Sequence, residues 1–341
     1  MITKKILNTI LLITIISCGQ SQQNKKMTTT EYTQQDILEL HKTVEHYEEE
    51  THYGVRVVAA NCNFEILIND RKVFFINSNK IGSVINGAYA PINYGILKSG
   101  MQQITVRMLP PVIDRKTEIK HPKLGNSQLN IEIVADDFME GVSTGEYSVF
   151  EWESPKEVKY VKAEGIDIPY FTQPNLPVYE HTDSFEVSVP YTIDGWSKSV
   201  NLLTNDTDEL KALTEETVAI YEELRQNFQN KKRDKLANQL FNNERIMAQQ
   251  IYHLEEDVKE QWNSYFEDYK QDNFKMMPLE NFRLVFYGNG KMVGLEQIGP
   301  YNQWDSALFS KYVKKGKNSF SYGFYRFLLH RPKPNAKLEV I

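Results

Sequence analysis

The sequence is poor in the residues from which many catalytic and metal centres are built. It has only two cysteines, Cys18 and Cys62, and seven histidines in 341 residues. Two cysteines cannot form a disulfide framework or a zinc site with four thiolate ligands. The phosphate-binding loop, the dinucleotide-binding glycine motif, the serine nucleophile elbow and the zinc-protease helix motif are all missing from the sequence. No motif therefore identifies a reaction.

Basic charge is also in short supply. The chain has 39 Lys and Arg against 45 Asp and Glu, which gives a formal net charge of −6. Non-specific binding to nucleic acid needs a basic face, so this balance argues against a nucleic-acid partner. Hydrophobic residues make up 41% and charged residues 25% of the chain. That is ordinary globular composition and excludes a wholly disordered chain.

The N-terminus combines a basic pair, an apolar run and a small residue before a cysteine. Lys4 and Lys5 precede the run 6–16, and a serine stands before Cys18. This is the pattern of a secretory signal peptide, and the run is too short for a transmembrane helix, which needs roughly 20 residues. We predict a signal peptide at 1–17.

Residues 15–18 read Ile-Ile-Ser-Cys and resemble a bacterial lipobox, although its first position is more often Leu. The resemblance implies cleavage before Cys18, acylation of that cysteine and anchoring to a membrane. Gly19 stands where an Asp retains many such lipoproteins in an inner membrane, so the resemblance favours the outer membrane. Cleavage removes two lysines, which leaves a body with a net charge of −8. The polar segment 18–32 is expected to form a lipid-anchored tether.

Short segments rich in β-forming residues dominate the sequence from about 52 to 203. Turn residues such as Asn69 and Asp70 separate them, and a loop rich in Gly, Ser and Asn is expected through Gly82 and Gly87. Many short strands with turns between them predict an antiparallel sandwich. We expect strands at 55–60, 64–68, 73–76, 104–109, 129–134, 147–152, 158–161, 185–189 and 200–203.

The order of segments within 64–108 resembles a jelly-roll or immunoglobulin-like domain. In those folds a strand ending in Asn-Asp hairpins back, and a strand of the form Ser-Gly-x-x-x-Ile-Thr-Val returns through the core. The resemblance concerns the fold and carries no function. Before this region, apolar residues at three- to four-residue spacing predict an amphipathic helix over 33–50. We therefore place a β-sandwich domain with an N-terminal helix at 33–205.

Helical periodicity returns in the last third of the chain. It predicts helices over 207–240, with a turn near 229–234, and over 243–269. A Gly-Asn-Gly turn at 288–290 joins two strands of a hairpin. Helices followed by an antiparallel meander predict an α+β domain at 206–341. This order of elements resembles an NTF2-like cone, in which a bent sheet wraps a helix and leaves a pocket.

His253 is the candidate catalytic residue. It is expected within the helix 243–269, followed by Glu255, Glu256 and Asp257. If it faces an NTF2-like pocket beside an acid, it can act as a general base. The alternative is a histidine on the polar face of a helix.

Asp136 and Asp137, after the strand 129–134, are the candidate metal ligands. Two acids in a sandwich loop can contribute to a Ca²⁺ site, which needs six to eight oxygens, or can form a simple acidic loop. Cys62 is expected to be a buried core residue. We predict no cofactor.

These observations favour a cell-envelope lipoprotein that acts as a non-catalytic binding module for a protein or a glycan. An immunity-type inhibitor that neutralises a toxin is one form of such a module. A glycan partner predicts a row of exposed aromatic rings among Tyr160, Tyr170, Tyr179 and Trp196. The alternative is a hydrolase or isomerase that uses His253 as a base in a pocket of the C-terminal domain.

Overall fold

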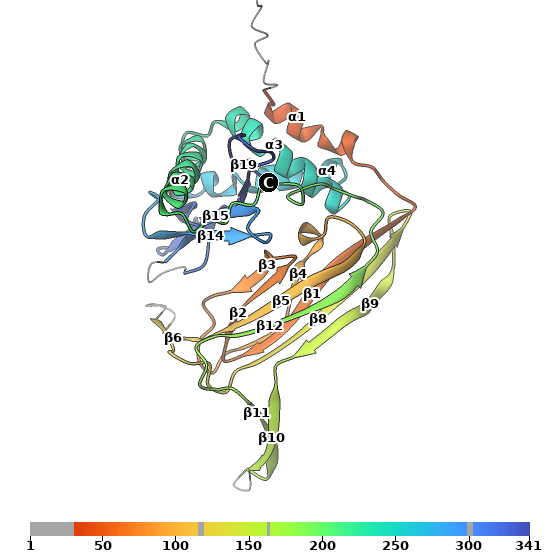
Figure 1. Ribbon diagram of the computed structural model, residues 1–341, viewed down its shortest axis with the longest axis vertical. Coiled ribbons are helices and arrows are strands. Elements are labelled where there is room, and N and C mark those ends of the chain that lie inside the picture. The colour runs from red at the N-terminus through yellow and green to blue at the C-terminus, as the bar shows by residue number, and fades with distance from the viewer. Residues whose placement is uncertain (1–30, 115–118, 162–163, 299–302) are drawn as a thin grey trace, which may run out of the picture. The chain divides into compact units, whose positions relative to one another are not determined.

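Two four-stranded antiparallel sheets form the first half of the molecule (Figure 1). One sheet has the strand order β4-β1-β8-β9, and the other has the order β12-β5-β2-β3. The predicted β-sandwich is therefore present. The strands are β1 (Glu49–Ala60), β2 (Asn63–Ile68), β3 (Arg71–Ile76), β4 (Val84–Pro91), β5 (Gly100–Leu109), β8 (Gln128–Met139), β9 (Val142–Glu153) and β12 (Tyr179–Val187). This structure is a computed structural model, and it describes residues 31–114, 119–161, 164–298 and 303–341.

Alternation along the strands places one face of each sheet in a shared core. On β1, Val55 and Val57 are fully buried, whereas Arg56 between them is exposed. The buried side chains of β2 and β5 complete this core from the other sheet. Burying each such aliphatic side chain contributes roughly 1.5–3 kcal/mol. Cys62 is buried in the same cluster, as predicted.

Residues 84–87, which we expected to lie in a loop, belong to strand β4. It pairs with β1 along most of its length. Gly87 has a φ of +70° and lies where the register of that pairing shifts. A glycine suits such a bulge because it adopts a positive φ without steric strain. The strand expected at 200–203 is absent, since these residues form a connection without ladder pairing.

Four further sheets, the helices and the connections between them make up the rest of the described chain. The two-stranded hairpin β10–β11 extends beyond the ends of the two sandwich sheets (Figure 1). The predicted order of helices followed by antiparallel strands is present in the C-terminal half. Its strands form a sheet of order β14-β15-β18-β19 and a sheet of order β13-β16-β17. The elements are β6 (Val112–Asp114), β7 (Ile119–Lys120), β10 (Lys156–Val161), β11 (Ile166–Phe171), α2 (Thr207–Gln229), α3 (Arg233–Gln250), α4 (Glu255–Ser264), β13 (Asp272–Met276), β14 (Phe282–Tyr287), β15 (Met292–Gln297), β16 (Phe309–Val313), β17 (Phe320–Phe324), β18 (Leu329–His330) and β19 (Glu339–Val340).

Two of the predicted helices are shorter than expected. The helix predicted over 33–50 is only α1 (Gln34–Leu38) and the 3-10 turn η1 (Leu40–Thr43), because the acidic residues after it enter β1. Ile37 and Leu40 are buried in the core of the C-terminal half. The helix predicted over 243–269 is interrupted between α3 and α4, where Tyr252 adopts a φ of +52° and its ring is buried in the sandwich core.

The turns of two hairpins meet where the sandwich contacts the C-terminal half. The β2–β3 turn has positive φ at Asn69 and Asp70, and the β14–β15 turn carries Asn289. The Asp70 carboxylate accepts a hydrogen bond from the Asn289 backbone N–H at 2.8 Å. The Asp70 carbonyl accepts another from the Gly288 N–H at 2.9 Å. Leu67 of β2 packs in one cluster with Trp196, Tyr287 and Met292, so the β2–β3 hairpin is held against the C-terminal half.

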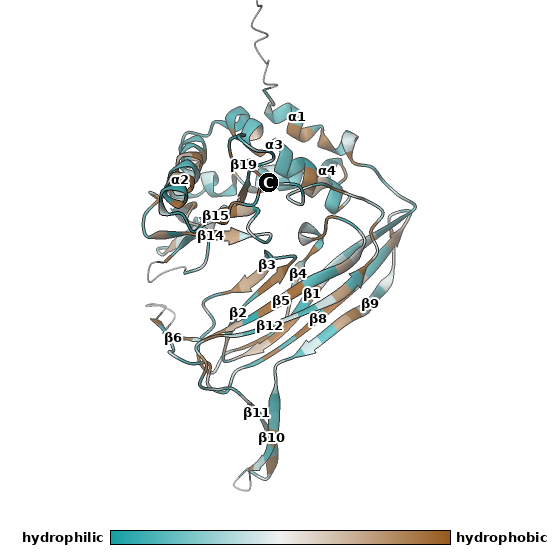
Figure 2. Ribbon diagram, viewed as in Figure 1, coloured by the Kyte–Doolittle hydropathy of each residue, from teal (hydrophilic) through white to brown (hydrophobic). Residues whose placement is uncertain are grey.

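Hydropathy along the ribbon agrees with this packing. Figure 2 shows hydrophobic and hydrophilic residues mixed along the sandwich strands, as expected of sheets with one buried face. The C-terminal core gathers large aromatic rings, with Phe228 and Trp262 fully buried. Across the described part of the chain, no helix combines the length and apolar character needed to cross a membrane.

Candidate functional site

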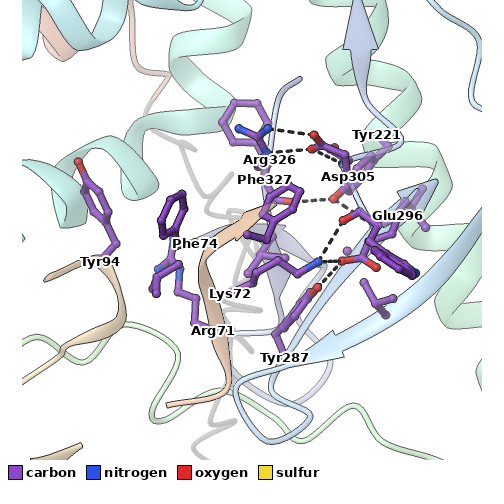
Figure 3. A pocket seen from close by; sticks show the side chains of 18 of the residues that line it. Arg71, Lys72, Phe74, Tyr94, Tyr221, Tyr287, Glu296, Asp305, Arg326 and Phe327 are labelled. Atoms are coloured by element: carbon purple, nitrogen blue, oxygen red, sulfur yellow. Dashed lines mark hydrogen bonds and ion pairs between the residues drawn. The ribbon is translucent and has the colours of Figure 1, made fainter. Parts of the chain in front are cut away.

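A cavity of about 420 Å³ lies between β3 and the C-terminal half (Figure 3). Residues 71–75 of β3 line one side, and segments 294–296, 304–306 and 326–328 line the opposite side. Its volume falls in the range of small-molecule sites, which are mostly apolar with a few placed polar groups. The remaining lining side chains are Tyr94, Tyr221, Met247, Val285 and Tyr287.

A β-bulge explains why successive residues of β3 border one cavity. β3 is the edge strand of its sheet, and it pairs with β2 alone within that sheet. Phe74 pairs with Ile66 and Lys72 pairs with Leu67, so Val73 is the extra residue. A bulge bends its strand and re-aims the neighbouring side chains. Both faces of β3 therefore contribute to the cavity lining.

Lys72 is held between two carboxylates. Its Nζ lies 2.7 Å from Glu65 Oε1 and 2.5 Å from Glu296 Oε1, and the three side chains are at most 10% exposed. Nζ also donates to the Trp304 carbonyl at 3.0 Å. Burying a lone charge costs several kcal/mol, so this cluster depends on mutual neutralisation. Burial opposes ionisation of Glu296, but Lys72, Tyr287 and Arg283 together outweigh it, and the pKa of Glu296 lies below its ordinary value.

Each of these carboxylates has a further cation on its outer side. Arg283 Nη2 donates to Glu296 at 2.9 Å, and Tyr287 also donates its hydroxyl proton to Glu296. Arg107 Nη1 reaches Glu65 at 3.5 Å. The Lys72 cluster is thus a closed network in which every carboxylate has a cationic partner.

Arg326 is the second cation of the lining, and it is also paired. Its Nε and Nη2 donate to the two carboxylate oxygens of Asp305 at 2.8 and 3.0 Å. Such a bidentate pair is strong and fixes the plane of the guanidinium. Tyr221 closes the wall nearby, because its hydroxyl donates to the Phe327 carbonyl at 2.5 Å and accepts from the Leu295 N–H at 3.2 Å.

Arg71 is the third cation, and it differs from the other two. Among the residues that the structure describes, no acceptor or carboxylate partners its guanidinium. Its carbon Cζ lies 5.1 Å from the centroid of the Trp196 ring, a cation–π contact. Figure 3 shows Arg71 beside Phe74, on the side of the cavity nearest Tyr94. Burial lowers the pKa of Arg71 to about 10, so it stays charged at neutral pH.

His253 lies outside this cavity. It is in the connection between α3 and α4 and not in the middle of a helix, because the helix predicted there is interrupted. It borders a shallow polar recess that also contains Glu256 and Asp257. Burial lowers the pKa of His253, and Asp257 opposes this only in part. The structure therefore does not bring His253 into an apolar pocket beside a carboxylate.

Asp136 and Asp137 stand within β8, which continues past the predicted strand end because it pairs with β1 and β9. The register of the β8–β9 pairing shifts at Asp137, and the two carboxylates accept hydrogen bonds from different partners. Asp136 accepts from the Ser143 hydroxyl at 2.6 Å. Asp137 accepts from Thr51 at 2.7 Å. In the described ranges, no group of three or more His, Cys, Asp or Glu side chains is arranged to hold a metal ion.

The four aromatic residues considered for glycan stacking are dispersed. Tyr160 is 66% exposed on the β10–β11 hairpin, which also carries Tyr170. Tyr179 stacks against Trp152 with ring centroids 6.3 Å apart, and Trp196 is buried. They do not form a row on one sandwich face. Cys18 lies outside the described residues, so its lipidation stays a prediction.

The charged residues of the cavity were not among the predicted site residues. A weak local signal was present, because Arg71 and Lys72 open a strand that is otherwise apolar, and Glu296 interrupts a fully buried strand. A charge in a buried strand needs a partner. Lys72 and Glu296 are 224 residues apart in sequence, however, and no pattern links them.

Comparisons with known proteins found no match. No family model matches it, and neither a curated protein nor a solved structure matches it. The resemblance of the C-terminal half to an NTF2-like cone therefore remains a prediction.

Proposed function

We propose that this chain is a non-catalytic binding protein of the cell envelope, anchored to a membrane through Cys18, and that the cavity beside β3 holds its ligand. The observation that carries the proposal is the lining of the cavity. Its walls are largely aromatic and aliphatic, and one cation among them, Arg71, has no hydrogen-bonding or ion-pair partner in the part of the chain that the structure describes. This combination is typical of a small-molecule binding site.

The state of the acids in the lining favours binding over catalysis. Glu296 and Asp305 are both engaged in short ion pairs. A general base must be free to accept a proton from its substrate, and neither carboxylate meets that condition. The alternative of a hydrolase or isomerase rests on His253, which borders a different, polar recess.

A cavity-filling variant tests the proposed ligand site. Met247 lines the cavity from α3, so Met247→Trp should fill part of it. We expect the wild-type chain to bind the neutral fluorescent probe N-phenyl-1-naphthylamine saturably, and Met247→Trp to weaken that binding by about tenfold, which corresponds to about 1.4 kcal/mol. The matched control is Met101→Trp, because Met101 is 63% exposed on β5. Equal binding by the two variants would contradict the proposal.

The anchor has a separate test. Cys18→Ala should release the protein from the membrane fraction of cells, because acyl chains on that residue provide the proposed attachment. Cys62→Ala is the control, since Cys62 is buried in the sandwich core and should leave fractionation unchanged. Retention of the Cys18→Ala protein in membranes would refute the anchoring proposal, and detergent fractionation would then assign its actual location.

A protein partner is the second candidate, and it is favoured by the outer face of the β4-β1-β8-β9 sheet. Opposite pairing places Glu132 and Glu151 beside each other on that face, in the same row as Arg56 and Tyr89. Tyr89 is 53% exposed. Arg56 forms ion pairs with Glu132 and Glu146, so Glu151 supplies the acidic charge that remains in this row. Acidic charge near an exposed aromatic ring suits a partner with a basic surface, such as the target of an immunity-type inhibitor.

Reversal of the charge of Glu151 tests whether a protein partner docks on this face. We expect Glu151→Lys to abolish capture of a basic protein from the native envelope by the full chain. Glu215→Lys is the matched control, because Glu215 is an exposed glutamate on α2, far along the sequence from this sheet. If both variants capture the same partner as the wild-type chain, the outer face is not the docking surface.

A further inference from the structure

We propose that the ligand of the cavity is a monocarboxylate with an apolar body, and that Arg71 binds its carboxylate group. The inference rests on the proposed function, since it names the chemical class of ligand for the same site. It is carried by the charge balance of the lining, by the free hydrogen-bond donors of Arg71 and by the apolar walls.

Two of the three cations that line the cavity are neutralised by carboxylates. In the lining, Lys72 is neutralised by its carboxylate network and Arg326 by Asp305. Arg71 has no such partner in the described part of the chain. One uncompensated positive charge therefore remains at the cavity. A single negative charge on the ligand would neutralise it, whereas a second would lie near Glu296 and Asp305 and be repelled.

The hydrogen-bonding geometry points to a carboxylate. A guanidinium presents five N–H donors in a planar fork that matches the two oxygens of a carboxylate. Trp196 contacts the Arg71 guanidinium through its ring and not through an acceptor. That contact restrains the cation without using its N–H donors. The donors thus remain available for a ligand, on a side chain that is only half-buried and lines the cavity.

The walls define the rest of the ligand. Phe74 lies beside Arg71, and Val73, Met247 and Leu328 line the same cavity. These side chains offer no hydrogen bond, so they suit an aliphatic or aromatic body and not a polyhydroxylated one. A volume of about 420 Å³ accommodates a small organic molecule.

Three probes of equal chain length test the inference: octanoate, octan-1-ol and octyl phosphate, each displacing N-phenyl-1-naphthylamine from the full chain near neutral pH. We expect octanoate to bind about tenfold more tightly than octan-1-ol, because a charge-assisted hydrogen bond is made only by the acid. Octyl phosphate should bind more weakly than octanoate. Equal binding of octanoate and octan-1-ol, or tighter binding of the phosphate, would overturn the inference.

Substitutions of Arg71 test whether its guanidinium recognises the carboxylate of the ligand. Arg71→Gln should remove the preference for octanoate while leaving the affinity for octan-1-ol unchanged, and Arg71→Lys should keep only part of the preference because it lacks the planar fork. Arg56→Gln is the matched control, since Arg56 is exposed on the other sheet. Binding of the neutral probe reports whether each variant still folds. If Arg71→Gln retains the preference, the inference fails. If the neutral probe does not bind the wild-type chain, the proposed function itself fails.

Discussion

Glu244 is a buried carboxyl group whose protonation should control stability near neutral pH. Its residue is 5% exposed on α3. Its Oε1 accepts hydrogen bonds from the Tyr265 hydroxyl at 2.8 Å and from Asn243 Nδ2 at 2.9 Å. Within the described residues, no cation lies in ion-pair contact with it. Burial raises the pKa of Glu244 from 4.5 to about 7, and the two hydrogen bonds offset this effect only in part.

The sign of the resulting pH dependence follows from linkage. Between the unfolded pKa of 4.5 and the folded pKa of about 7, the native state binds the proton more tightly than the unfolded state does. The free energy of unfolding therefore falls as the pH rises through this window, and it levels off above it. At about 1.4 kcal/mol for each pH unit, the loss amounts to about 3 kcal/mol.

Glu244→Gln should abolish this loss, because an amide resembles the protonated acid in shape and carries no charge at any pH. We compare the free energy of unfolding of the variant with that of the wild type. This difference, variant minus wild type, should be about 3 kcal/mol larger at about pH 8 than at about pH 4.5. Urea unfolding curves at several pH values measure this difference. The other ionisable groups contribute equally to both proteins, so their effects cancel when the two free energies are subtracted. Glu215→Gln is the control, because Glu215 is exposed on α2. A constant difference across the pH range would refute the reasoning.

Three further predictions concern the packing around the cavity, and urea unfolding checks each. Lys72→Met should cost about 3–5 kcal/mol because it leaves two buried carboxylates without their shared cation, whereas the exposed control Lys198→Met should change stability by less than about 0.5 kcal/mol. Gly95→Ala should cost about 1–3 kcal/mol, since a Cβ there would lie 2.7 Å from the Cβ of Ile68. Tyr221→Phe should cost about 1–3 kcal/mol, because it leaves a buried carbonyl and a buried N–H unsatisfied. Losses well below these ranges would contradict the predictions and show that the surrounding structure relaxes around each change.

Local signals were sufficient for much of the fold. The β14–β15 hairpin was predictable because its Gly-Asn-Gly turn and the apolar residues on either side all lie within 282–297. The sandwich strands were predictable because alternation along β1 and β5 reflects one buried face. Each of these features depends on neighbours in the sequence, which is the information that periodicity carries.

Features decided by tertiary contacts were missed. β4 contains Asn and Gly, which favour loops, but its pairing with β1 outweighs those preferences. The apolar periodicity continues from α3 into α4, so it gave no warning of the interruption at Tyr252. The ring of Tyr252 is buried in the sandwich core, and its position is set by residues distant in sequence. The cavity belongs to the same class, because its cations and carboxylates come together only after both halves fold.

Arg71 is half-buried and Glu244 is buried, and neither has an ion-pair partner among the described residues. Burial raises the pKa of the Tyr94 hydroxyl to about 12, and Glu244 adds to this effect while Arg71 opposes it. Each charge costs folding free energy, but the two can be relieved in different ways. Glu244 is not among the residues that line the cavity, and uptake of a proton neutralises it. Arg71 lines the cavity, so a bound anion can neutralise it. A cation that serves packing alone would be expected to have a carboxylate partner, as Lys72 and Arg326 have, and the absence of one at Arg71 in the described structure is therefore best understood as a feature of ligand binding.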